Sequence, residues 1–187
     1  NKIEVLGEKL KNGEISQENL LIYCGATNYI DEDEIEEDVE KDALTQLEAV
    51  NLLLDDLDIK SAQYTQKESG VERAQNIELF TQQTFTTLSA IKCLDEGVDI
   101  PQIENAVILA SSSNKREFVQ RRGRVLRRNP GKERANIYDF VVFDEEDINS
   151  HINKIERARV LEFSSLAINY DDLRQKYKKY LEGDIYY

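Results

Sequence analysis

The sequence contains no Met and no Trp, and only two Cys, two Pro and one His in 187 residues. So few Cys and His exclude a zinc or disulfide framework, and we expect Cys24 and Cys93 to be buried thiols in a reducing compartment. No apolar run approaches the roughly 20 residues that span a bilayer, and no signal peptide is evident, so we expect a cytoplasmic protein without membrane contact. The first residue is Asn1 rather than Met, which indicates a fragment of a longer polypeptide.

Charge is unevenly distributed along the chain. The formal net charge is −13 with a pI near 4.6, which would argue against a polyphosphate partner if the charge were evenly spread. Residues 115–134, however, hold nine Lys and Arg against two acids, a local charge of +7, so the remainder carries −20. Residues 31–42 hold nine acids and one base, and we expect them to form a solvated surface loop.

Apolar periodicity predicts strands that alternate with helices. The expected strands are Leu20–Cys24, Ile59–Tyr64, Phe85–Ile91, Ala106–Ala110 and Ala135–Phe143. Three helices are expected: Ala43–Leu57, Ser69–Phe80 and Asn114–Leu126. The second begins at a capping box formed by Ser69 and Glu72, and its apolar face consists of Val71, Ala74, Ile77 and Phe80.

This alternation predicts an α/β fold with a parallel sheet covered by helices on both faces. The loops after Cys24, Tyr64, Ile91 and Ala110 would then share the carboxyl edge, where the working site of such sheets lies. We expect a sheet domain over residues 1–143 and a helical extension of one or two helices over 144–187.

Arginines repeat within the basic segment. Arg121, Arg124 and Arg127 are spaced three residues apart, which places them near one helical face. Guanidinium groups are always charged and present forked donors that suit phosphate oxygens. A solvated helix face paired with acids is the structural alternative. The bias toward Arg, the helix-unfriendly Gly123 and the position after a strand favour an anion site.

A second polar segment, Asp95–Pro101, follows the strand that ends at Ile91. Gly97 permits a tight backbone path, Pro101 prevents a helix, and Asp99 could accept hydrogen bonds from ribose hydroxyls. Taken alone, this segment would be an acidic turn.

Together, the two segments resemble the C-terminal, second RecA-like domain of superfamily 2 DEAD/DEAH-type helicases and translocases. Residues 88–101 resemble motif V, and Gln120–Arg127 fits the motif VI pattern Q-x-x-G-R-x-x-R at every defined position. Leu20–Thr27 lies where motif IV belongs, and Gln63–Phe80, with Arg73, resembles the unit that follows it. The D-E-G-V-D-I-P and Q-R-R-G-R-V-L-R forms are more similar to DNA-directed members, namely restriction-enzyme (type I and III) motors and excision-repair helicases, than to DEAD-box RNA helicases.

The resemblance implies a role for each matching residue. Arg124 and Arg127 match arginine fingers that stabilise charge on the γ-phosphate of an ATP held, with Mg²⁺, mainly by an N-terminal RecA-like domain. The nucleotide-contacting positions would be Gln120, Glu96, Gly97 and Asp99. From their place at the same edge we expect nucleic-acid phosphate contacts at Thr65, Ser69, Lys92 and Ser111. Arg121, Arg122 and Arg128 are structural or face the DNA.

The sequence lacks the other half of an ATP site. No G-x-x-x-x-G-K-[ST] pattern occurs, and no acid pair of the Asp-Glu-Ala-His kind follows an apolar strand, so the isolated chain should not hydrolyse ATP. The resemblance therefore implies half of an ATP-dependent DNA motor, whose partners are the N-terminal domain, DNA and possible restriction or repair subunits. The alternatives are half of an RNA helicase and a non-catalytic RecA-like module. The intact motif VI argues against the latter.

Overall fold

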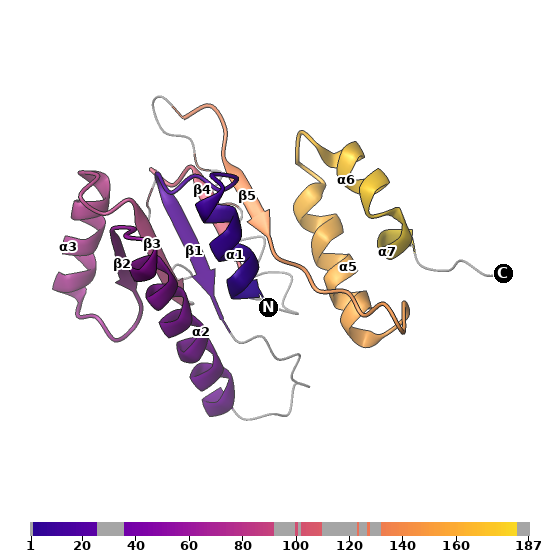
Figure 1. The fold of residues 1–187 in the computed structure, drawn as a ribbon, viewed down its shortest axis with the longest axis horizontal. Helices are drawn as coiled ribbons and strands as arrows, with labels where there is room; N and C mark the ends of the chain where they lie inside the picture. Colours follow the sequence, from indigo (N-terminus) through magenta and orange to yellow (C-terminus); the bar gives the residue numbers. More distant parts are fainter. Residues whose placement is uncertain are drawn as a thin grey trace.

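A parallel sheet forms the centre of the protein (Figure 1). The computed structural model describes residues 2–25, 36–91, 100, 102–109, 123, 127 and 132–182, with the backbone alone for 36–44, 163 and 182. In this part of the chain the strand order is β2-β3-β1-β4-β5, and every pairing is parallel. The strands are β1 (Leu20–Cys24), β2 (Ser61–Tyr64), β3 (Thr87–Ile91), β4 (Asn105–Ile108) and β5 (Asn136–Asp139).

Helices pack on both faces of this sheet, which confirms the predicted fold class. The described helices are α1 (Lys2–Lys11), α2 (Glu36–Asp56), α3 (Gly70–Thr81), α5 (His151–Ser164), α6 (Tyr170–Lys176) and α7 (Lys178–Glu182). Figure 1 shows α1 and α2 crossing one face of the sheet, α3 beside β2, and α5 to α7 beyond β5.

The strands divide their side chains between two cores. In β1, Leu20, Ile22 and Cys24 join one buried cluster, and Leu21 and Tyr23 join the other, because successive residues of a strand point to opposite faces. Leucines of α1 and α2 close the first cluster, and Phe80 of α3 closes the second. A continuous apolar run in β1 is thus explained by burial on both faces.

The first helix, α1, was not predicted. Leu6 and Leu10 are buried and Ile3 packs against the same core, while the residues between them are mostly polar. This spacing of three and four residues is the signal of an amphipathic helix and was present in the sequence.

The acidic run is helical where it is described. Residues 36–42 form the first two turns of α2, so the predicted loop is wrong for them, and residues 31–35 lie outside the described part of the chain. Glu is a good helix former, and acids near a helix N-terminus interact favourably with the helix dipole. A dense acidic run is therefore compatible with a helix start as well as with a loop.

The buried face of α3 is narrower than predicted. Phe80 is fully buried and Ile77 packs beside it, but Val71 is 69% exposed and Ala74 is exposed too. Polar contacts replace the apolar ones near β2: Asn76 Nδ2 donates to the Gln63 carbonyl at 3.0 Å. The capping box that starts the helix is present as predicted.

The C-terminal extension consists of three helices in the described residues, where one or two were expected. Ser150 caps α5, its hydroxyl accepting a hydrogen bond from the amide of Asn153 at 3.2 Å. A short turn separates α5 from α6, in which Leu166 and Ile168 are strongly exposed.

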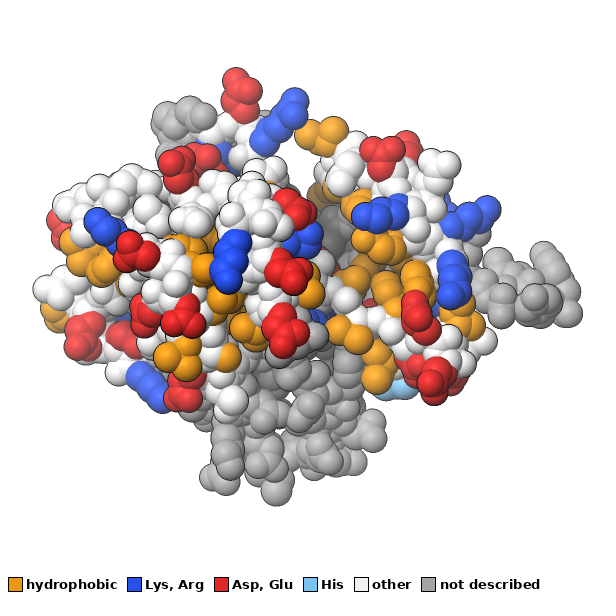
Figure 2. All heavy atoms as spheres, in the orientation of Figure 1, with side chains coloured by type: hydrophobic (Ala, Val, Ile, Leu, Met, Phe, Trp, Pro, Cys, Tyr) orange, Lys and Arg blue, Asp and Glu red, His pale blue; other side chains and the backbone are white. Residues whose placement is uncertain are grey.

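Acidic side chains are spread over the face formed by α1 and α2, interspersed with fewer basic ones (Figure 2). This agrees with the negative net charge of the sequence outside residues 115–134. Of the two cysteines, Cys24 is buried as predicted, and Cys93 lies outside the described residues. Within the same part of the chain, no helix has the length and apolar character needed to cross a bilayer.

Candidate functional site at the carboxyl edge of the sheet

The carboxyl ends of the strands lie together, as predicted. In the register of the sheet, Cys24 pairs with Ile91, Tyr23 pairs with Ile108, and Ile108 pairs with Asp139. Since all pairings are parallel, the segments that follow β1, β2, β3 and β4 leave from one edge. This is the edge at which ligands bind in open parallel sheets.

The loop after β2 holds two of the predicted phosphate-contacting residues. Thr65 is 3% exposed, its amide donates to Glu68 Oε2 at 2.5 Å, and its hydroxyl accepts from the Lys67 amide at 3.1 Å. This loop is therefore organised by internal hydrogen bonds, in which the Thr65 amide donates and the Thr65 hydroxyl accepts.

Ser69 is the N-cap of α3. Its hydroxyl accepts from the Glu72 amide at 3.2 Å, and its amide donates to Glu72 Oε2 at 2.8 Å. Hydrogen bonds from the backbone and side chain of Ser69 lower the pKa of Glu72. In this conformation the amides of Ser69 and Glu72 are bound within the capping box, and contact of Ser69 with nucleic acid stays a prediction.

Most other predicted site residues lie outside the described part of the chain. These are Lys92, Glu96, Gly97, Asp99, Ser111, Gln120 and Arg124. The end of motif V is described: Ile100 and Ile103 are buried in the core on the α3 face, and the Ile103 amide donates to the Ile100 carbonyl at 3.3 Å. The chain at the end of motif V is thus held by the packing of Ile100 and Ile103 on the α3 face of the sheet.

Two positions of motif VI are described. Gly123 is helical and exposed, and a Cβ added there would meet no described atom within 4 Å. Packing in the described surroundings therefore does not require glycine at this position. Arg127 is also exposed. The structure does not describe Arg124 and Arg127 together, so their joint action stays a prediction.

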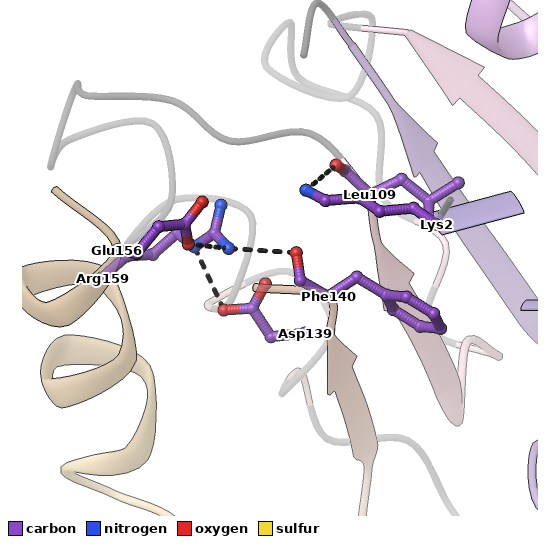
Figure 3. A network of polar contacts seen from close by, with 6 residues as sticks. All are labelled: Lys2, Leu109, Asp139, Phe140, Glu156 and Arg159. Atoms are coloured by element: carbon purple, nitrogen blue, oxygen red, sulfur yellow. Dashed lines mark hydrogen bonds and ion pairs between the residues drawn. The ribbon is translucent and has the colours of Figure 1, made fainter. Parts of the chain in front are cut away.

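A buried charge cluster at the carboxyl edge was not predicted (Figure 3). Arg159 of α5 is 1% exposed and lies between two carboxylates: its Nε is 3.2 Å from Asp139 Oδ2, and its Nη2 is 2.5 Å from Glu156 Oε2. The same Nη2 donates to the Phe140 carbonyl at 3.2 Å. Because Asp139 ends β5, these contacts join α5 to the edge of the sheet.

Lys2 of α1 completes this cluster from the other side. Its Nζ donates to the Leu109 carbonyl at 2.9 Å, directly after β4. Burial is the main cause that lowers the pKa of Lys2, and Arg159 adds to it. Burial also raises the pKa of Asp139 to about 6, and the neighbouring Glu156 adds to this rise while Arg159 and Lys2 oppose it. We call Lys2, Asp139, Glu156 and Arg159 the charge cluster.

Hydrogen bonds join the segment after β5 to the helices that follow. The side chain of Asn153 in α5 donates to the carbonyls of Asp144 and Asp147 at 2.7 and 2.9 Å, and accepts from the Asp144 amide at 2.8 Å. Phe143 stacks on Tyr180, with ring centroids 4.5 Å apart. The extension is therefore connected to the sheet by a short, well-bonded segment.

Metal binding finds no support in the described residues, where no three or more His, Cys, Asp or Glu side chains are grouped so as to hold an ion.

Comparison with solved structures supports the fold. The C-terminal part of the Fun30 ATPase domain is similar over 93% of this chain and 54% of its own, with a TM-score of 0.60 and 18% identity. The C-terminal domain of the DEAD-box protein Dbp5 is similar over 95% of this chain and 90% of its own, with a TM-score of 0.55 and 18% identity. At these identities the likeness establishes the RecA-like fold alone.

Sequence comparison identifies the family. The DNA 3'-5' translocase XPB2 of Sulfurisphaera tokodaii (strain DSM 16993 / JCM 10545 / NBRC 100140 / 7) is 34% identical over 64 residues, which are 34% of this chain and 15% of that protein. The chain thus matches only a small part of its curated relative. The helicase conserved C-terminal domain matches residues 1–129, which is more than half of the chain. The protein therefore belongs to the helicase conserved C-terminal domain family.

Proposed function

We propose that this chain is the C-terminal motor half of an ATP-dependent DNA helicase or translocase. The observation that carries the proposal is the pairing of a complete motif VI, Gln120–Arg127, with motif V on a parallel sheet whose strands all end at one edge. Family membership supports it, because the matched region, residues 1–129, includes both motifs.

In this proposal the arginines act on ATP held by an N-terminal RecA-like domain. Arg124 and Arg127 donate hydrogen bonds to the γ-phosphate as negative charge develops on it, which accelerates hydrolysis by about 10³–10⁵. Gln120 senses the nucleotide, and Glu96, Gly97 and Asp99 contact the ribose side of the site. The Mg²⁺ ion is held by the other domain, since this sequence contains no phosphate-binding loop of the Walker type.

Lys92, Ser111, Thr65 and Ser69 would contact the backbone phosphates of the nucleic acid at the same edge. The Ser69 hydroxyl and the Thr65 amide are bound by neighbouring groups, whereas the Thr65 hydroxyl accepts from the Lys67 amide and can donate its own hydrogen to a phosphate oxygen. Lys92 and Ser111 lie outside the described residues, and their contact with phosphate is proposed from their place in the sequence alone.

The preference for DNA has two supports. The motif V and VI sequences differ from the DEAD-box forms, and the Sulfurisphaera relative is named a DNA translocase. An RNA helicase half remains the second candidate, because the C-terminal domain of a DEAD-box protein shares the fold.

Nucleic-acid-stimulated ATPase activity tests the proposal. In the full-length protein, single- or double-stranded DNA should raise the turnover of ATP at least tenfold, and RNA of the same length should raise it less. The isolated chain of 187 residues should show no turnover above buffer. Stimulation by RNA alone would replace the DNA assignment, and ATP turnover by the isolated chain would refute the two-domain site.

A further inference from the structure

The backbone ends of two neighbouring strands are each held by a cation from a different helix. Lys2 Nζ of α1 binds the Leu109 carbonyl after β4 at 2.9 Å, and Arg159 Nη2 of α5 binds the Phe140 carbonyl after β5 at 3.2 Å. The two carbonyls are neighbours, because the amide of Phe140 donates to the carbonyl of Ile108 at 3.1 Å. Four elements, α1, β4, β5 and α5, therefore meet at one buried point (Figure 3).

Burying these charged groups costs desolvation free energy, so the cluster is not explained by stability alone. Arg159 is 1% exposed and Glu156 is fully buried, so both charges have been removed from water. Desolvation of such a group outweighs the attraction unless geometry is good, and apolar side chains of similar volume often stabilise a fold as well or better. Ion pairs and hydrogen bonds are directional, however, and they fix the relative position of the elements that carry them. The charge cluster therefore suits a positional role.

The cluster lies at the start of the segment that leads to motif VI. Leu109 is fully buried, and its amide donates to the Tyr23 carbonyl at 3.0 Å, so both of its backbone groups are bound. In the sequence, residues 110–119 lead directly from Leu109 to Gln120–Arg127. The point from which motif VI leaves the sheet is thus set by contacts from α1 and from β1.

We propose that Lys2 and Arg159 are positioning residues for the ATPase reaction. They hold the ends of β4 and β5 against α1 and α5. Through these strand ends they also fix the start of the motif VI segment. The inference rests on the proposed function, in which motif VI supplies the arginine fingers. A displacement of about 1 Å in a reacting group can lower turnover about 100-fold. Loss of the cluster should therefore lower kcat and leave the binding of ATP nearly unchanged.

The test uses DNA-stimulated ATPase activity of the full-length protein. In Arg159→Gln and Lys2→Gln we expect kcat to fall about 10- to 100-fold and KM for ATP to change less than about twofold. The triple variant Asp139→Leu, Glu156→Leu, Arg159→Met keeps the buried volume without charge and should show the same loss of kcat. It covers the case in which Arg159→Gln alone fails to fold. A folded triple variant with normal kcat would overturn the inference.

A matched control lies on the same helix. Arg157 of α5 donates from Nε to the Tyr180 carbonyl at 2.7 Å and from Nη2 to the Ile148 carbonyl at 3.3 Å, so it joins α5 to α7 and to the segment before α5 rather than to the sheet. Arg157→Gln should lower the melting temperature but leave kcat within about twofold, since it does not reach the strand ends. An equal loss of kcat in Arg157→Gln would show a merely structural effect and overturn the inference.

Two further variants separate this inference from the proposed function. If Arg124→Ala and Arg127→Ala lose turnover while the cluster variants retain it, only the positioning role is wrong. If the two finger variants retain turnover, the proposed function fails and the inference fails with it.

Discussion

Replacing Asp139 with Asn should change how the stability of the protein depends on pH. The carboxylate oxygens of Asp139 are buried at the end of β5, and this burial raises the pKa of the carboxyl group from 3.8 to about 6. An acid whose pKa is higher in the folded than in the unfolded state holds its proton more tightly when folded. The contribution of Asp139 to the free energy of unfolding is therefore largest below about pH 4. It falls as the pH rises from about 4 to about 6 and is constant above that range. The Asn side chain of the Asp139→Asn variant has nearly the same shape as Asp and carries no charge at any pH.

The magnitude follows from the shift. About two pKa units correspond to ~3 kcal/mol over the whole range, of which ~2 kcal/mol falls between about pH 4.5 and 7. We expect the free energy of unfolding of the wild-type chain, measured in urea, to fall by that amount relative to Asp139→Asn over this interval. The comparison with the variant cancels the titration of the many exposed acids, which both proteins share.

Two results would refute this reasoning. Parallel curves for the two proteins would show that Asp139 titrates in the folded state as it does in the unfolded chain. A wild-type curve that rises relative to the variant would show that Arg159 and Lys2 dominate over burial, and that the pKa of Asp139 is lowered.

Other substitutions test the packing and the capping of α3, and the burial of β1. Phe80→Ala should cost about 3–5 kcal/mol of unfolding free energy, whereas Val71→Ala, on the predicted but exposed part of the helix, should cost less than about 0.5 kcal/mol. Equal costs would restore the predicted apolar face. Ser69→Ala should cost about 1 kcal/mol because it removes the N-cap, and no change in the urea midpoint would contradict the capping box. Burial raises the pKa of the Cys24 thiol to about 12, so iodoacetamide at about pH 8 should leave Cys24 unmodified by mass spectrometry until the chain is unfolded, and rapid native labelling would contradict its burial.

The sheet could be predicted because its strands carry their own signal. The run Leu20–Cys24 is apolar throughout and too short for a helix, and the order of strands and helices leaves a parallel sheet as the simple solution. The carboxyl edge followed from that topology. The helix α1 also had a clear signal in Leu6 and Leu10, so the sequence was sufficient to predict it.

The charge cluster could not be predicted from sequence. Glu156 and Arg159 are three residues apart in a helix, a spacing that is usually an exposed ion pair of small energy. Asp139 stands at the end of a strand, where polar residues are common. Only the tertiary position of α5 beside β5 shows that these charges are buried and joined to the backbone of Phe140. Sequence patterns report local periodicity, and they do not report which face of one element is covered by another.

In the proposed function, this chain supplies arginine fingers to an ATP site shared with another domain. Single-turnover hydrolysis of ATP by the DNA-bound full-length protein tests it most directly, with Arg124→Ala and Arg127→Ala compared with Arg134→Ala, an exposed arginine of the same basic segment outside motif VI. We predict that the two finger variants bind ATP within about threefold of the wild-type affinity and hydrolyse it about 10³-fold more slowly or worse, with Arg134→Ala near the wild-type rate. Hydrolysis at the wild-type rate in both finger variants would show that neither arginine acts as a finger.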